Sequence, residues 1–169
     1  MNGTKPRTRD IKQAAREFLA RDRIAVVGVS RDGTSPANLI YRKLRQTGHQ
    51  VFSVNPNAQQ AEGDPCYRDL AAVPGGVEGV VIVTKPEVSA SVVDQCAVLG
   101  VRQVWIHRSF GQGSVSREAI DRCRLHGISV IPGGCPMMHC VPVDPGHACM
   151  RAVLRLTGGL PVPESASRR

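Results

Sequence analysis

A glycine-bearing turn after the first strongly apolar segment is the first place where the chain could bind a charged ligand. Residues 24–27 read Ile-Ala-Val-Val, a short apolar run typical of a strand covered on both faces. Gly28 ends the run, Ser30 and Arg31 follow in the turn, and Pro36 suits the first position of a helix. Because the free amide groups at the start of a helix lie at its positive end, this turn is suited to a phosphate.

The glycine spacing of this turn is close to the fingerprint of dinucleotide-binding folds but differs at its centre. Gly28 and Gly33 match the outer glycines of the G-x-G-x-x-G pattern, whereas Ser30 replaces the middle one. The middle glycine normally lets the backbone approach a pyrophosphate, and a serine hydroxyl can instead donate a hydrogen bond to a phosphate oxygen. Taken alone, the pattern does not specify the nucleotide.

The end of the second expected strand, 50–54, argues against an ordinary NAD site. Such sites usually place Asp or Glu there to hold both ribose hydroxyls, but this chain has Asn55 and then Pro56, with no acid before Glu62. A carboxylate at this place would repel a phosphorylated ribose, so its absence tolerates one. The cations that could serve such a phosphate are Arg31, Arg42, Lys43 and Lys85.

Cysteine and histidine residues gather near the carboxyl terminus, at Cys135, His139, Cys140, His147 and Cys149. Both residue types are zinc ligands, but their spacing lacks the paired C-x2-C form of a structural zinc site, so we expect no metal. Cys149, with Val153 four residues on, is expected to pack in the core. We find no nucleophile elbow, Ser-His-Asp pattern or pair of acids at strand ends, and so we expect no catalytic residue.

Length and charge exclude some classes of protein. With 169 residues and 41% hydrophobic content, the chain suits one domain with a sizeable core. Its net charge of +8 is concentrated at the ends, since residues 1–23 carry +4, residues 151–169 carry +3 and the body is near neutral. The sequence contains no recognisable nucleic-acid-binding motif beside this charge, so we do not expect nucleic-acid binding. Without a long apolar run or a signal peptide, we expect no membrane association and a cytoplasmic protein with reduced thiols.

Apolar runs alternate with helical patterns along the chain. We expect strands over 24–27, 50–54, 79–83, 101–106 and 128–131. We expect helices over 8–21, 36–47, 86–100, 116–126 and 144–156, and mostly loop over 58–77 with a short extended piece at 66–67. This alternation predicts an α/β, Rossmann-like single domain, with a parallel sheet, helices on both faces and ligands at the carboxyl ends of the strands. An amino-terminal amphipathic helix and basic arm, the domain itself and a mobile tail are expected at 1–22, 23–158 and 159–169.

Residues 24–56, IAVVGVSRDGTSPANLIYRKLRQTGHQVFSVNP, closely resemble the start of the small single-domain CoA-binding proteins. Those proteins are similar to the CoA-binding domain of the succinyl-CoA synthetase alpha subunit. The likeness continues through GDPCYRDLAAVP, VEGVVIVTKPE and VRQVWIH, and it covers residues 20–135. The specific features are the VVG-S-R run, the VNP after the second strand, the CY and L of the connecting loop, and the Trp after the fourth strand.

The resemblance implies a domain that binds CoA or an acyl-CoA. It implies that the diphosphate is contacted by Gly28, Ser30 and Arg31. The ribose and adenine region would be lined by Asn55 and Pro56, and the adenine side would be bounded by Thr84, Lys85 and Pro86. Asn38, in the first helical turn, and Lys43, for the ribose phosphate, are further candidates. The synthetases have a second domain with a phosphorylatable histidine, which we do not expect here, so their ligase activity is not carried over.

Cys135 follows two glycines at the end of an expected strand, near where the resemblance would bring the thiol of pantetheine. Amide groups in such a turn can favour a thiolate. We therefore hypothesise that Cys135 is an exposed, reactive thiol that can form a mixed disulfide with CoA.

The sequence is compatible with three functions. The first is binding of CoA or an acyl-CoA as a carrier, a sensor or a CoA-binding subunit, with a protein partner or homo-oligomer left unspecified. The alternative is an NAD(P)-linked oxidoreductase on the same fold, against which Ser30 and Asn55 argue. The third is a regulator whose basic ends bind nucleic acid, and the near-neutral body argues against that reading.

Overall fold

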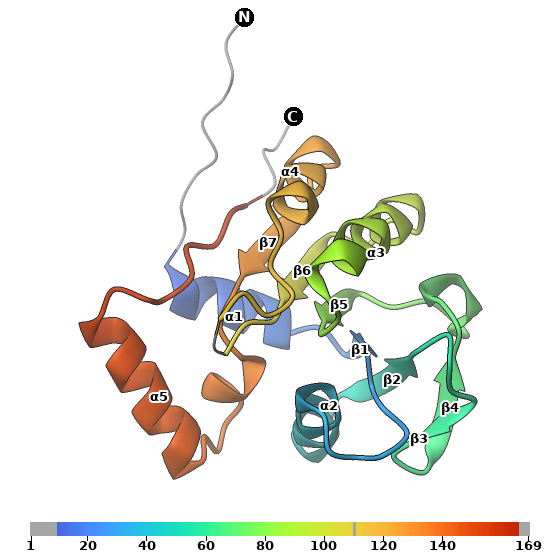
Figure 1. The fold of residues 1–169 in the computed structure, drawn as a ribbon, viewed down its shortest axis with the longest axis horizontal. Coiled ribbons are helices and arrows are strands. Elements are labelled where there is room, and N and C mark those ends of the chain that lie inside the picture. Colours follow the sequence, from blue (N-terminus) through green and yellow to red (C-terminus); the bar gives the residue numbers. More distant parts are fainter. Residues whose placement is uncertain (1–9, 110, 166–169) are drawn as a thin grey trace, which may run out of the picture.

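Buried β-branched residues build the centre of a seven-stranded sheet in the computed structural model, which describes residues 10–109 and 111–165 (Figure 1). The spatial order is β3-β4-β2-β1-β5-β6-β7. The strands are β1 (Arg23–Val27), β2 (Gln50–Val54), β3 (Gln60–Ala61), β4 (Asp64–Tyr67), β5 (Gly79–Ile82), β6 (Gln103–Ile106) and β7 (Ser129–Pro132). All neighbouring strands pair in parallel except β3, which runs antiparallel to β4. The predicted α/β, Rossmann-like fold is confirmed.

Helices cover both faces of this sheet. They are α1 (Ile11–Leu19), α2 (Pro36–Gln46), α3 (Pro86–Val98), α4 (Arg117–Leu125) and α5 (Pro145–Leu156), with short 3-10 helices η1 (Leu70–Ala72) and η2 (Pro136–Met138). One buried cluster joins α1 and α2 to the sheet, and a second joins α3 and α4 to the opposite face. Within the described parts of the chain, no helix has the length and apolar character needed to cross a bilayer.

Trp105 anchors the first of these two clusters. Its ring is fully buried and meets Phe18 of α1 edge-on, with the ring centroids 5.5 Å apart. The indole Nε1 donates to the carbonyl oxygen of Gly133 at 2.9 Å, so the one polar atom of the side chain is satisfied. This contact ties the end of β6 to the turn after β7.

The segment expected to be mostly loop contributes two strands, although its extended piece at residues 66–67 was anticipated. β4 pairs in parallel with β2, and β3 folds back on β4 through Glu62 and Gly63. Both turn residues have positive φ, of 56° and 82°. Their place in the sheet was missed because pairing of β4 with β2 and of β3 with β4, rather than a long apolar run, holds them extended.

Part of the carboxyl-terminal segment, over residues 160–164, packs on the domain. Leu160 packs on the core and Pro161 is buried. Glu164 exchanges two backbone hydrogen bonds of 2.9 Å with Val130 of β7, and its carboxylate accepts two hydrogen bonds of 2.6 Å from Arg124. The expected basic arm over 1–9 and the last four residues of the expected tail lie outside the described residues.

Helix α5 lies at the periphery and contains no buried residue (Figure 1). The prediction that Cys149 packs in the core was wrong, since Cys149 is exposed and Val153 is 51% exposed. The helix instead contacts the domain through the partly buried Met150 and through Arg151, which donates to the carbonyl oxygen of Met138 at 2.8 Å. The helix therefore turns the opposite face toward the core.

Candidate functional site

The turn after β1 begins with a glycine that the packing of the strands requires. The amide of Gly28 donates to the carbonyl oxygen of Val54 at 2.8 Å, and its φ is +105°. A Cβ atom at this position would lie 2.1 Å from the carbonyl oxygen of Val83, far inside contact distance. Gly28 thus brings the ends of β1 and β5 together and shapes the carboxyl edge of the sheet.

Asn38 holds the turn from inside the protein. The amide of Ser30 donates to Asn38 Oδ1 at 2.9 Å, and Asn38 Nδ2 donates back to the carbonyl oxygen of Ser30 at 2.8 Å. The Asn38 side chain is fully buried at the start of α2. The structure therefore gives Asn38 a role in positioning the turn, whereas the sequence singled it out as a ligand contact.

The hydroxyl of Ser30 is engaged within the same turn. It donates to Asp32 Oδ1 at 2.7 Å, and Asp32 also accepts from the amide and the hydroxyl of Thr34, both at 3.2 Å. The hydrogen bond from Ser30, followed by those from Thr34, lowers the pKa of Asp32, so this exposed carboxylate is ionised near neutral pH. An arriving phosphate would have to take the Ser30 hydroxyl from this carboxylate.

Glu62 is a residue of the site region that sequence reasoning missed. Its carboxylate accepts hydrogen bonds from Asn38 Nδ2 at 2.6 Å and from Arg42 Nη1 at 2.8 Å and 3.0 Å. The Glu62 side chain is only 10% exposed, so this pair neutralises Arg42. Glu62 stands in an expected loop with no apolar pattern around it, and its position follows from the β3–β4 turn.

Lys43 does not reach the region where the sequence placed it. One step along a helix turns a side chain by about 100°, so Lys43 faces away from the hairpin that holds Arg42. Its Nζ donates to the carbonyl oxygen of Pro142 at 2.5 Å, in the segment before α5. Within the described chain this contact places Lys43 apart from the loop that follows β2.

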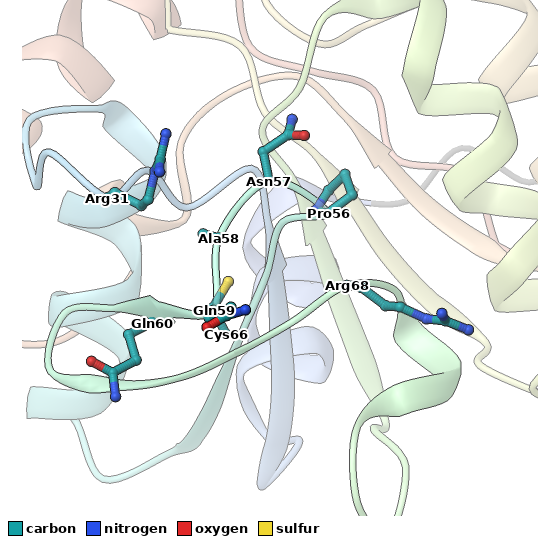
Figure 2. A pocket seen from close by; sticks show the side chains of 8 residues that line it. All are labelled: Arg31, Pro56, Asn57, Ala58, Gln59, Gln60, Cys66 and Arg68. Atoms are coloured by element: carbon teal, nitrogen blue, oxygen red, sulfur yellow. The ribbon is translucent and has the colours of Figure 1, made fainter.

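Two pockets meet at the loop after β2. The outer pocket has a volume of about 910 Å³, and its lining comprises Arg31, Pro56, Asn57, Ala58, Gln59, Gln60, Cys66 and Arg68 (Figure 2). The inner pocket, of about 380 Å³, lies between the strand ends and α3 and is lined by Val27, Gly28, Val54, Asn55, Pro56, Arg68, Asp69, Leu70, Thr84, Val88, Ser91, Val92 and Gln95. Pro56 and Arg68 belong to both. The pockets therefore form adjoining parts of one surface at the carboxyl edge of the sheet.

The predicted site residues divide between these pockets and other places. Gly28, Asn55, Pro56 and Thr84 line the inner pocket, and Arg31 lines the outer pocket. The linings of these two pockets do not include the remaining predicted residues Ser30, Asn38, Lys43, Lys85 and Pro86.

Asn55 joins the two loops that border the pockets. Its Nδ2 donates to the carbonyl oxygen of Val29 at 2.9 Å, and its Oδ1 accepts from the amide of Asn57 at the same distance. Asn55 therefore couples the turn after β1 to the loop after β2. This contact gives a structural reason for asparagine at the position where an acid was expected in an NAD site.

Cys135 does not have the exposure that the sequence suggested. It is 3% exposed, and burial raises the pKa of its thiol to about 12. The glycine turn before it is covered by the carboxyl-terminal segment, since a Cβ at Gly134 would lie 3.3 Å from Pro161. Cys135 itself packs with Met138 and Cys140 in the buried cluster that contains Trp105, which the local sequence pattern does not reveal.

Two partly or fully buried histidines, His107 and His139, are uncharged near pH 7. Burial, with a smaller contribution from His147, lowers the pKa of His107 to about 4. His107 Nε2 lies 2.9 Å from the hydroxyl oxygen of Ser109. Burial also lowers the pKa of His139 to about 4, with Arg151 adding to the effect. Over residues 10–109 and 111–165, no group of three or more potential metal-ligating side chains comes together.

The part of the chain that lines both pockets matches a known protein family. The sequence matches the family described as CoA binding domain over residues 22–140, which include both pocket linings. The chain belongs to the CoA binding domain family. The resemblance seen in the sequence is thereby confirmed.

Proteins similar to this chain include a ligase and two proteins that it matches over most of their length. Acetate–CoA ligase (ADP-forming) I of Archaeoglobus fulgidus is 25% identical over 118 residues, which cover 66% of this chain and 17% of the ligase. The uncharacterized protein YneT of Bacillus subtilis is 26% identical over 125 residues, covering 73% of this chain and 90% of YneT. A hypothetical protein from Pyrococcus horikoshii OT3 superimposes with a TM-score of 0.73 at 26% identity, over 85% of this chain and 99% of its own.

Proposed function

We propose that this protein binds CoA or an acyl-CoA at the carboxyl edge of its sheet. The observation that carries the proposal is the pair of adjoining pockets at Pro56, the smaller one with several aliphatic side chains in its lining and the larger one bordered by Arg31. A nucleotide with a long polar extension matches this combination, because its base needs apolar walls and its phosphates need cations. The family membership supports CoA as that nucleotide.

The inner pocket is suited to the adenine. Apolar side chains of Leu70, Val88 and Val92 border it, and Ser91 and Gln95 supply polar groups from the same helix. Aliphatic walls with a few placed polar atoms are the usual surroundings of a planar base. The ribose would then lie against the loop that begins at Asn55.

The diphosphate would lie at the turn after β1. Arg31 is exposed there and lines the outer pocket, so its guanidinium can turn toward an anion. The Ser30 hydroxyl, which now donates to Asp32, would transfer its hydrogen bond to a phosphate oxygen. Because Asp32 is exposed, water and salt screen its repulsion of the phosphate.

No catalytic role is part of this proposal. The carriage, sensing or presentation of CoA to a partner needs a binding surface and no reacting side chain. Cys135, the nucleophile that the sequence brought forward, is buried with a raised thiol pKa. We therefore propose that the chain acts as a carrier, a sensor or a CoA-binding subunit.

Binding can be tested with a variant that fills the inner pocket. Ser91 is exposed on α3 and lines that pocket, so Ser91→Trp should fill it without disturbing the core, and Ser91→Ala is the matched control. CoA at a hundredfold excess over its dissociation constant should stabilise the wild type and the control by about 2.7 kcal/mol. The same CoA concentration should leave Ser91→Trp unshifted in thermal denaturation. Equal stabilisation of both variants would contradict the assignment of the pocket.

The choice of ligands distinguishes the alternative function. CoA and acetyl-CoA should stabilise the protein, whereas NAD and NADP should not. Stabilisation by NAD or NADP alone would instead support an oxidoreductase on the same fold.

A further inference from the structure

Arg68 directly follows β4, whose pairing with β2 the sequence did not predict. β4 pairs in parallel with β2, with Val54 opposite Tyr67, and the amide of Asn55 donates to the carbonyl oxygen of Tyr67 at 2.8 Å. Arg68 is the next residue, so it leaves the sheet beside the carboxyl end of β2. The parallel register therefore brings a cation next to the loop that begins at Asn55.

The guanidinium of Arg68 is available for an incoming anion. Its side chain is 82% exposed, and its contact is with the adjacent Asp69, at 3.0 Å between Nε and Oδ2. Exposed pairs of this kind contribute little stability. Asp69 has a second function, since its Oδ1 caps η1 by accepting from the amide of Ala72 at 2.9 Å. Arg68 can therefore move without breaking the cap.

Other cations near the edge are differently placed. Arg31 lies on the far side of the outer pocket from Arg68, and the Arg68 side chain extends away from it (Figure 2). Arg42 is paired with the largely buried Glu62, and Lys43 is held at Pro142. Among the described residues lining the inner pocket, Arg68 is the one basic side chain.

We infer that Arg68 selects ligands that carry a phosphate on the adenosine ribose. The inference rests on the proposed function, because it takes the adenine to occupy the inner pocket. With the adenine there, the ribose would adjoin Asn55 and Pro56, and a phosphate on its 3′ oxygen would lie beside the residues that line both pockets, Pro56 and Arg68. A guanidinium can donate two hydrogen bonds to one phosphate. The chemical class recognised is thus a 3′-phosphorylated adenosine nucleotide.

The test compares CoA with 3′-dephospho-CoA, which lacks only this phosphate. Isothermal titration calorimetry would measure both dissociation constants for the wild type, for Arg68→Gln and for the control Arg31→Gln. We expect the wild type to prefer CoA by about tenfold or more, as one charge-assisted phosphate contact implies. Arg68→Gln should reduce this preference to about twofold or less while leaving the affinity for 3′-dephospho-CoA unchanged. Arg31→Gln, at the diphosphate, should weaken both ligands equally and keep the preference.

The possible failures are distinguishable. If the wild type binds both ligands and Arg68→Gln keeps the full preference for CoA, the role of Arg68 is overturned and the proposed function stands. If the wild type binds neither ligand, the proposed function itself fails, and the inference fails with it. Because Arg68 is exposed, Arg68→Gln should have the same melting temperature as the wild type without ligand. A large decrease in that melting temperature would mean that Arg68 stabilises the fold, and it would overturn the assignment of Arg68 to ligand binding only.

Discussion

Substitution of Gly28 by alanine should destabilise the protein much more than the same change at a glycine with similar backbone geometry. The alanine Cβ would lie 2.1 Å from the carbonyl oxygen of Val83, a backbone atom that cannot rotate away. An alanine at φ +105° also adopts a conformation that side chains disfavour, at a cost of about 1–3 kcal/mol. Separating the ends of β1 and β5 to relieve the contact adds about 1–3 kcal/mol.

Gly48 provides the matched control for this prediction. Its φ is +94°, and a Cβ there would meet no atom within 4 Å, so Gly48→Ala carries the conformational cost without the clash. Both substitutions reduce the entropy of the unfolded chain equally, and that contribution cancels in the comparison. The difference between the two variants therefore isolates the cost of the close strand approach.

Urea denaturation followed by far-ultraviolet circular dichroism would measure the free energies of unfolding. We expect Gly28→Ala to lose about 1–3 kcal/mol more than Gly48→Ala. A difference below about 0.5 kcal/mol would refute the reasoning, because it would mean that β1 and β5 separate at almost no cost. CoA affinity should fall for Gly28→Ala alone, since only this glycine lines the inner pocket.

Three further predictions concern stability. The depressed pKa values of His107 and His139 mean that the unfolded chain binds more protons between about pH 6.5 and about pH 4. Stability should therefore fall as pH decreases through this window, by up to about 3 kcal/mol for His107 and by less for the more exposed His139. His107→Gln should reduce that slope in urea titrations, and an unchanged slope would count against burial as the cause. Trp105→Phe should cost about 2–3 kcal/mol in urea denaturation, because it leaves a buried carbonyl oxygen without its donor; a loss under about 0.5 kcal/mol would contradict this. Glu164→Ala should speed hydrogen exchange of the Val130 amide, and unchanged exchange would show that the ion pair does not hold the segment.

Much of the fold could be predicted because its central strands are dense apolar runs. β1 and β5 are buried throughout their apolar residues, and the alternation with helices fixes a parallel sheet. β3 and β4 could not be predicted as sheet strands, since they are short and have few apolar residues. Their conformation depends on pairing with β2 and on a turn at Glu62, both of which need the folded chain.

The candidate site was predictable where its residues directly follow strong strands. Gly28, Asn55 and Thr84 follow β1, β2 and β5 closely, and the topology gathers them at the inner pocket. Arg68 was not predicted as a site residue because its position depends on β4, a short strand with few apolar residues in its sequence. Cys135 was misjudged because it packs in the buried cluster around Trp105 beside the short helix η2, an element with no local signature.

The pairing of Glu164 with Val130 has a consequence for how the protein is prepared. β7 is the last strand of the sheet, and an open strand edge is a template for pairing with another molecule. The returning segment occupies part of that edge through two backbone hydrogen bonds. A recombinant version shortened after residue 158 would uncover this template, and aggregation in concentrated samples is the outcome to guard against.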